Sequence, residues 1–198
     1  LPKPSECIDE YPHQFSGGMR QRIVIAIALV NNPRLLIADE PTTALDVTVQ
    51  AQILELMMNL QQEFGSAIIL ITHDLGVVAE VADEVMVMYA GQTMESSKVQ
   101  TLFDTPSHPY TRGLLGSVRS LDNSERGALH TIAGNPPSMI SLPGGCPFHP
   151  RCEFSAAMNG LCATVQPSLR VLPATGSESA CHLNDDQLLS LGRSVSHD

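Results

Sequence analysis

Ser16, Gly17 and Gly18 are the first residues of this sequence whose types and order suggest chemistry. A serine that caps a helix and is followed by two glycines leaves backbone N–H groups uncovered at the positive end of that helix. Such a helix start is an anion site. Serine followed by glycine is also common as a plain helix cap, so this motif alone leaves both interpretations open.

Two further polar groups each follow a short apolar run. Asp39 and Glu40 come directly after Leu35–Ala38, and His73 comes after Ala67–Ile71. One carboxylate of such a pair can hold Mg²⁺ through water, while the next orients an attacking water toward a phosphoryl group. A histidine in the second position could sense the terminal phosphate. The alternatives are a solvated strand end for the acidic pair and a structural role for His73.

The spacing of the apolar residues predicts the elements that position these groups. Helices are expected over 17–30, 49–64 and 75–82, and strands over 35–38, 67–71 and 84–89. Strands that alternate with helices in this way predict an α/β fold with a parallel sheet. Ligands of such sheets bind at the carboxyl ends of the strands, where Asp39, Glu40 and His73 are expected to lie.

Composition excludes several classes of protein. The 198 residues are 43% hydrophobic and 16% charged, as in an ordinary globular protein, and the net charge of -10 argues against nucleic-acid binding. The longest apolar run, Ile23–Val30, is far shorter than the roughly 20 residues that span a bilayer. No signal peptide is recognisable, and because the first residue is Leu rather than Met, we expect that the sequence continues upstream.

The amino-acid composition changes near residue 105, where prolines become frequent. We therefore expect one domain over 1–104 and an irregular extension over 105–198. Four of the five cysteines fall in the extension, at Cys146, Cys152, Cys162 and Cys181. Without a secretory signal they are expected to be reduced thiols or metal ligands rather than disulfides.

In their order and spacing, the motifs of residues 10–105 resemble the C-terminal half of an ABC-type ATPase cassette. The matching residues are the signature motif Ser16-Gly17-Gly18, the Walker B pair Asp39 and Glu40, the D-loop Ala44-Leu45-Asp46 and the switch histidine His73. Phe15 stands where the family usually has Leu, and Met19 where it usually has Gln. The resemblance implies a P-loop-NTPase-type parallel sheet joined to the cysteine-containing extension.

The resemblance also implies roles for these residues toward ATP and Mg²⁺. Asp39 would hold Mg²⁺, Glu40 would be the catalytic base and His73 would sense the γ-phosphate. Ser16, Gly17, Gly18 and Asp46 would bind nucleotide that is shared with a second cassette. The sequence contains no G-x-x-x-x-G-K-[ST] phosphate loop, since its lysines are Lys3 and Lys98. We expect that loop upstream of Leu1, and the chain alone to be inactive as an ATPase.

Three segments of the extension resemble the C-terminal region of oligopeptide and dipeptide importer ATPases. They are Ser107-His108-Pro109-Tyr110-Thr111-Arg112, Gly134-Asn135-Pro136-Pro137-Ser138 and Gly145-Cys146-Pro147-Phe148-His149-Pro150-Arg151-Cys152. This resemblance implies a peripheral subunit at the cytoplasmic face of the membrane that drives peptide import. Its partners would be a second ATPase subunit, identical or paralogous, two membrane permease subunits and, indirectly, a substrate-binding protein. Alternatives are a nickel-importer cassette, the head of a DNA-repair or chromosome-organising ATPase, and a metal- or redox-sensing module.

The cysteines of the extension predict a metal centre. Cys146, Cys152, Cys162 and Cys181 lie in a proline-rich segment with little core of its own, which a metal would stabilise. Their gaps contain no Cys-x-x-Cys pair, so a [4Fe–4S] cluster is favoured over zinc. Extensions of this kind in some peptide-importer ATPases also look like cluster carriers. Zinc in the same cage and unligated thiols remain the alternatives.

Overall fold

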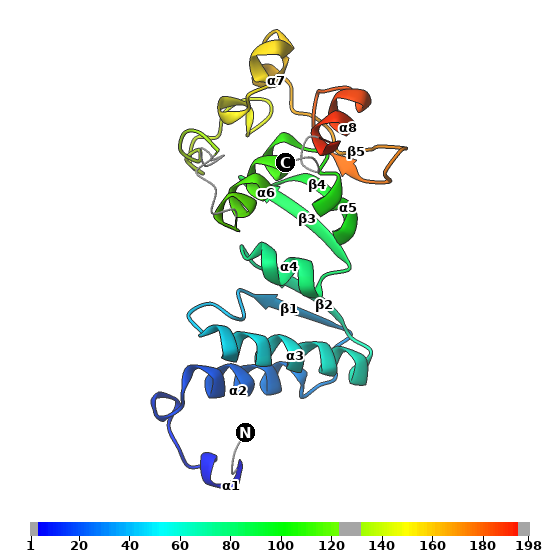
Figure 1. Ribbon diagram of the computed structural model, residues 1–198. Coiled ribbons are helices and arrows are strands. Elements are labelled where there is room, and N and C mark those ends of the chain that lie inside the picture. Colours follow the sequence, from blue (N-terminus) through cyan, green and yellow to red (C-terminus); the bar gives the residue numbers. More distant parts are fainter. Residues whose placement is uncertain (1–3, 123–131, 194–198) are drawn as a thin grey trace. The chain divides into compact units, whose positions relative to one another are not determined.

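The computed structural model describes residues 4–122 and 132–193 (Figure 1). The chain divides into two compact units between Val77 and Val78. Each unit is described by itself below. The domain boundary that the change in composition predicts near residue 105 stays a prediction. No helix in the described ranges is long and apolar enough to cross a membrane.

The first unit has the predicted alternation of helix and strand. Its elements are α1 (Pro4–Cys7), a 3₁₀ turn (Pro12–Gln14), α2 (Gly17–Leu29), β1 (Leu35–Asp39), α3 (Val47–Phe64) and β2 (Ala67–Ile71), and α4 (Leu75–Val81) begins in it. The predicted bounds of β2 are confirmed, and those of α2, β1, α3 and α4 are correct to within two residues. Gly65 ends α3 in the left-handed conformation, φ 62°, as a glycine C-cap does.

The strands β1 and β2 pair in parallel, with Leu35 opposite Ala67 and Asp39 opposite Ile71. One face of this pair packs on α2 and α3. The core there consists of Ile25, Leu29, Ile53 and Met57, with Leu36, Ala38 and Ile68 packed against it. The predicted parallel α/β arrangement is therefore present, and it carries both strand ends to the same edge.

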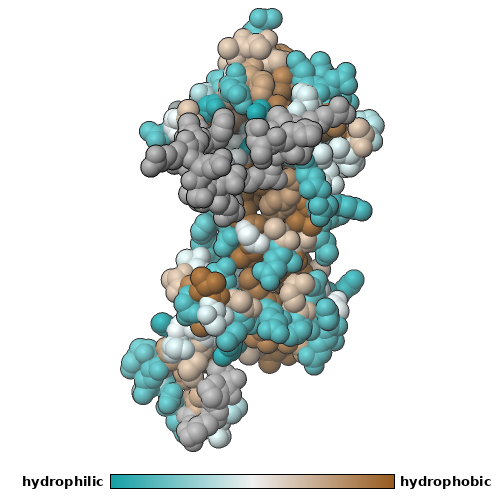
Figure 2. All heavy atoms as spheres, in the orientation of Figure 1, coloured by the Kyte–Doolittle hydropathy of each residue, from teal (hydrophilic) through white to brown (hydrophobic). Residues whose placement is uncertain are grey.

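Neither strand of this pair is fully buried. Their residues alternate between exposed and half-buried, because helices of this unit cover one face of the pair. The other face leaves Leu35, Ile37, Ile69 and Ile71 between 47% and 61% exposed. Exposed hydrophobic side chains of this kind appear as brown areas among the teal surface in Figure 2.

The second unit is built on an antiparallel sheet with the strand order β3-β4-β6-β5. Its elements are β3 (Glu84–Tyr89), β4 (Gln92–Lys98), α5 (Val99–Asp104), α6 (Pro109–Asp122), 3₁₀ turns at His149–Arg151 and Ser155–Met158, α7 (Leu161–Thr164), β5 (Arg170–Val171), β6 (Glu178–Ser179) and α8 (Asp185–Arg193). The predicted strand over 84–89 is confirmed as β3, and both residues of the turn that follows it, Ala90 and Gly91, have positive φ. The sequence did not predict β4.

Aromatic residues form one core of the second unit. The Tyr89 ring lies 5.3 Å from the Phe148 ring and 4.7 Å from the Tyr110 ring, between centroids. Arg151 donates to the carbonyls of Ala133 and Ile132 and to the Tyr89 hydroxyl. Two of the segments that resemble the importer extension, 107–112 and 145–152, therefore contribute residues to one packed structure.

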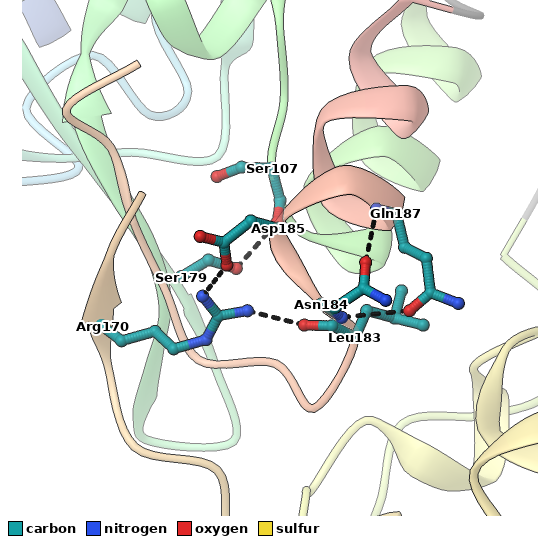
Figure 3. Close-up of polar contacts among 7 residues, drawn as sticks. All are labelled: Ser107, Arg170, Ser179, Leu183, Asn184, Asp185 and Gln187. Carbon is teal, nitrogen blue, oxygen red and sulfur yellow. Dashed lines mark hydrogen bonds and ion pairs between the residues drawn. The ribbon is translucent and has the colours of Figure 1, made fainter. Parts of the chain in front are cut away.

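The C-terminal end of the second unit is held by polar contacts (Figure 3). Arg170 on β5 forms an ion pair with Asp185 at the start of α8 and donates to the Leu183 carbonyl across 2.6 Å. Asn184 and Gln187 each accept the other's backbone N–H through their side chains, which caps α8.

Candidate functional site

The predicted base and switch residue of the first unit contact each other. The Nδ1 atom of His73 lies 3.1 Å from Oε1 of Glu40. The backbone explains this proximity, because the Glu40 N–H donates to the Ile71 carbonyl across 2.9 Å and His73 follows Ile71 by two residues. The Glu40 side chain is 45% exposed and that of His73 is 80% exposed, so both groups are open to a ligand from solution.

Glu40 begins a tight turn whose last residue also contacts its carboxylate. Thr43 donates its hydroxyl to Oε2 of Glu40 across 2.8 Å, and its backbone N–H to the Glu40 carbonyl across 3.1 Å. The hydrogen bond from Thr43, followed by that from His73, holds the pKa of Glu40 below its ordinary value of 4.5. Glu40 is therefore an anion at neutral pH with both carboxylate oxygens engaged.

The two other predicted carboxylates occupy different environments. Asp39 is the last residue of β1 and is exposed, beside Glu40. Asp46 precedes α3 and its Oδ1 accepts the Val49 N–H across 3.0 Å, so it serves as the helix cap. Asp39 therefore has the accessible oxygen that a hard cation needs, whereas one oxygen of Asp46 is committed to the backbone.

The predicted anion-binding motif lies at the start of α2. Ser16 caps this helix, and its Oγ accepts the Met19 N–H across 3.3 Å. Within the described part of the chain, no acceptor takes the N–H of Gly17 or Gly18, which are the first two residues of the helix. These two amides are therefore available to an anion.

The two glycines also permit close packing. A Cβ atom at Gly18 would lie 2.6 Å from Cγ1 of Val49 on α3, and one at Gly17 would lie 3.2 Å from Cδ2 of Leu45. The distance at Gly18 is too short for any side chain without a shift of Val49. The motif therefore fixes how α2 and α3 meet, a role that the sequence did not indicate.

The four cysteines of the second unit lie in two neighbouring cores. Cys146 and Cys162 are buried in the aromatic core, where Cys152 packs against them, and Cys181 packs on the leucine core that includes Leu188. Burial, with a smaller effect of the neighbouring cysteine thiolates, raises the pKa of Cys152 to about 12 and that of Cys181 to about 11. Across residues 4–122 and 132–193, no three His, Cys, Asp or Glu side chains are grouped so that they could hold a metal ion.

Sequence reasoning missed two residues that contact the site. Thr43 was not singled out, although a hydroxyl three residues after the acidic pair, in a turn, was a usable signal. Gln50 on α3 donates to Oδ2 of Asp74 across 3.3 Å, and Oδ1 of Asp74 accepts the Gly76 N–H at the start of α4. Gln50 thereby connects α3 to the residue that follows His73.

Two family models match parts of this chain. Residues 94–158 match the model described as "Oligopeptide/dipeptide transporter, C-terminal region". Residues 2–43 match the model described as "ABC transporter". The first match contains the Ser107–Arg112 and Gly145–Cys152 segments, and the second contains the signature motif and the acidic pair.

Curated relatives align over most of the chain. Oligopeptide transport ATP-binding protein OppD of Haemophilus influenzae is 58% identical over 155 residues, which are 78% of this chain and 48% of the relative. OppD of Salmonella typhimurium is 52% identical over 96% of this chain and 55% of the relative. AppD of Bacillus subtilis is 54% identical over 93% of this chain and 55% of the relative. The chain thus spans about half the length of the curated relatives it matches.

Proposed function

Because the chain belongs to the oligopeptide and dipeptide transporter family of ABC ATP-binding proteins, we propose that it is part of an ATP-hydrolysing subunit that drives peptide import. The contact between Glu40 and His73 at the ends of two parallel strands is the observation that carries this proposal. The relatives are named for oligopeptide transport, which favours peptides over nickel as the cargo.

Glu40, His73 and Asp39 each have a different role in the proposed ATP hydrolysis. Glu40, held as an anion, accepts the proton of the attacking water and aligns that water with the γ-phosphate. His73 holds the γ-phosphate in position beside Glu40 and the attacking water. Asp39 fits Mg²⁺, because Mg²⁺ is held by one or two carboxylates while water and phosphate oxygens complete its shell. Mg²⁺ would neutralise charge on the phosphate oxygens.

The start of α2 acts on nucleotide bound mainly by a partner subunit. The free amides of Gly17 and Gly18 and the positive helix end would contact its phosphates, and Ser16 keeps the helix start in place. Asp46 would support this contact through the loop that precedes α3. A phosphate loop would be needed to complete each site, and these 198 residues contain no G-x-x-x-x-G-K-[ST] motif.

The proposed assembly contains two ATP-binding subunits, identical or paralogous, and two membrane permease subunits. A substrate-binding protein selects the peptide and reaches this subunit through the permeases. The subunit would lie peripherally at the cytoplasmic face of the membrane. Its net charge of -10 supports partners other than nucleic acid.

A Glu40→Gln variant of the intact subunit tests the catalytic assignment. Glutamine keeps the shape of the side chain and removes the base, so ATP turnover should fall by roughly a hundredfold or more while ATP remains bound. Turnover close to that of the unmodified subunit would refute the assignment.

We further propose that Cys146, Cys152, Cys162 and Cys181 ligate a [4Fe–4S] cluster in the assembled subunit. The neighbouring cysteine thiolates help to raise the pKa values of Cys152 and Cys181, which supports the proximity of these side chains. The described side chains are not arranged as a ligand set. Because burial raises their pKa values, ligation would release protons and cluster loading would weaken at low pH.

Purification without oxygen, followed by iron, sulfide and zinc analysis, tests the cluster. Four iron and four sulfide ions per chain, with visible absorption lost in a Cys146→Ser variant, are expected. Cys7→Ser is the matched control, because Cys7 belongs to the first unit. A colourless protein with one zinc ion, or without metal, would rule the cluster out.

A further inference from the structure

The Glu40 carboxylate is held from two sides, and the contact from Thr43 is the shorter one. Thr43 Oγ1 lies 2.8 Å from Oε2, whereas His73 Nδ1 lies 3.1 Å from Oε1. A hydroxyl donates one proton, so the Thr43 contact fixes which oxygen of the carboxylate faces the turn. The other oxygen is thereby directed to His73.

The turn that carries Thr43 is anchored independently of any ligand. The Thr43 N–H donates to the Glu40 carbonyl, and the Glu40 N–H donates to the Ile71 carbonyl of β2. Glu40 has φ 45° and Ala44 has φ 61°, a region that residues other than glycine occupy infrequently. Sparsely populated backbone conformations persist where surrounding contacts fix them, and here they bring the Thr43 hydroxyl over the carboxylate.

We propose that Thr43 is a positioning residue that orients the Glu40 carboxylate, so that Oε1 faces His73 and the attacking water. This inference rests on the proposed function of Glu40. In solution an exposed glutamate samples several rotamers, and a second hydrogen bond restricts its plane before nucleotide arrives. Thr43 acts through Glu40 and does not itself touch the reacting atoms. Such restriction is a contribution of orientation to the rate.

The ¹³C chemical shift of the Glu40 carboxyl carbon at neutral pH gives a readout that does not depend on catalysis. Because the Thr43 hydroxyl lies 2.8 Å from Oε2 of Glu40, its removal should change that chemical shift. A Thr43→Val variant removes the hydroxyl with little change of shape, while Thr43→Ser keeps it. Thr42→Val is the matched control, because the Thr42 backbone carbonyl accepts the Leu45 N–H and this contact is kept when the side chain is replaced.

The experiment uses the intact ATP-binding subunit with ¹³C-labelled glutamate, in which a Glu40→Gln sample identifies the Glu40 carboxyl signal. Thr43→Val should change the Glu40 carboxyl chemical shift and lower kcat roughly tenfold or more, with KM for ATP unchanged. Thr43→Ser should restore the chemical shift and most of kcat, and Thr42→Val should leave the chemical shift unchanged.

An unchanged Glu40 carboxyl chemical shift in Thr43→Val would overturn the proposal, as would a rise in KM with kcat unchanged. Thr43→Ala removes the same hydroxyl and replaces the valine variant if that protein does not fold. Failure of the catalytic assignment is seen separately, as normal turnover by Glu40→Gln, and does not affect the chemical-shift measurement.

Discussion

Ser107 donates both its backbone N–H and its hydroxyl to the same carboxylate oxygen of Glu95, each across 2.8 Å. Glu95 lies on β4 and is fully buried, and the Ser107 carbonyl in turn accepts the Ser179 hydroxyl of β6 across 2.7 Å. Thus the segment before α6 is joined through one acidic side chain to the sheet. The Ser-His-Pro-Tyr-Thr segment accordingly has a structural role in the second unit.

Glu95 should make the stability of the second unit depend on pH. Burial raises its pKa above 4.5, so the folded state binds the proton more tightly than the unfolded state. The contribution of Glu95 to the free energy of unfolding is therefore fully present below pH 4.5 and is lost as pH rises from there through the raised pKa. Thermal unfolding of the intact subunit, followed by tyrosine fluorescence at several pH values, measures this. Glu95→Gln should flatten that dependence. An equally steep dependence in the glutamine variant would contradict the assignment.

His73→Ala should reduce ATP turnover by about a hundredfold and leave nucleotide binding largely unchanged. His73 lies beside the base Glu40, where it would contact the γ-phosphate, so the variant removes that contact. Because the His73 side chain is 80% exposed, its loss leaves no cavity in the hydrophobic core. The variant should also raise the pKa of Glu40, since His73 is the second cause that lowers it. Turnover and equilibrium binding of a fluorescent ATP analogue separate the two effects. A loss of binding with normal turnover would point to a structural histidine.

Gly17→Asp in one of two cassettes should disable the nucleotide site that this helix start shares with the partner and spare the other site. A carboxylate there would repel the phosphates that the free amides attract. Gly17→Ala is the matched control, because its Cβ would meet the flexible end of Leu45 at 3.2 Å without adding charge. Photolabelling with an ATP analogue, read at each site separately, checks this. Equal loss at both sites in a folded protein would refute action across the interface.

The 198-residue chain by itself should aggregate. Its parallel pair exposes one apolar face, on which Ile37 and Ile69 are register partners and are 61% and 49% exposed. Replacing both with threonine should increase the monomer fraction in size-exclusion chromatography, because threonine suits a strand and is polar. Ile53→Thr is the contrasting control, since Ile53 is fully buried and its loss should destabilise the core. A monomeric unmodified chain with cooperative unfolding would contradict this expectation.

The sequence predicted the main helices and strands of the first unit well, because the spacing of the apolar residues and the positions of the turn residues indicate the same elements there. Asp39, Glu40 and His73 were correctly expected at strand ends, since a parallel pair carries those ends to one edge. The roles of these residues stay predictions. The contact of Glu40 with Thr43 was not foreseen, because it depends on a positive φ that a glutamate rarely adopts.

The second unit was harder to predict because its stability depends on contacts between distant residues. β4 contains Glu95, Ser96, Ser97 and Lys98, which lack the apolar alternation that indicates a strand. Glu95 is tolerated inside because a serine twelve residues later supplies two donors, and no local pattern reveals that pairing. Likewise, the spacing of the four cysteines did not show that they belong to two cores.

The close approach of Gly18 to Val49 has a mechanical consequence. Val49 is the third residue of α3 and its N–H is capped by Asp46, so a side chain at Gly18 would have to push Val49 away from that cap. Gly18 must therefore stay small for packing alone, whether or not its amide binds an anion. Loss of activity in a Gly18 variant would by itself report on helix packing and not on nucleotide contact.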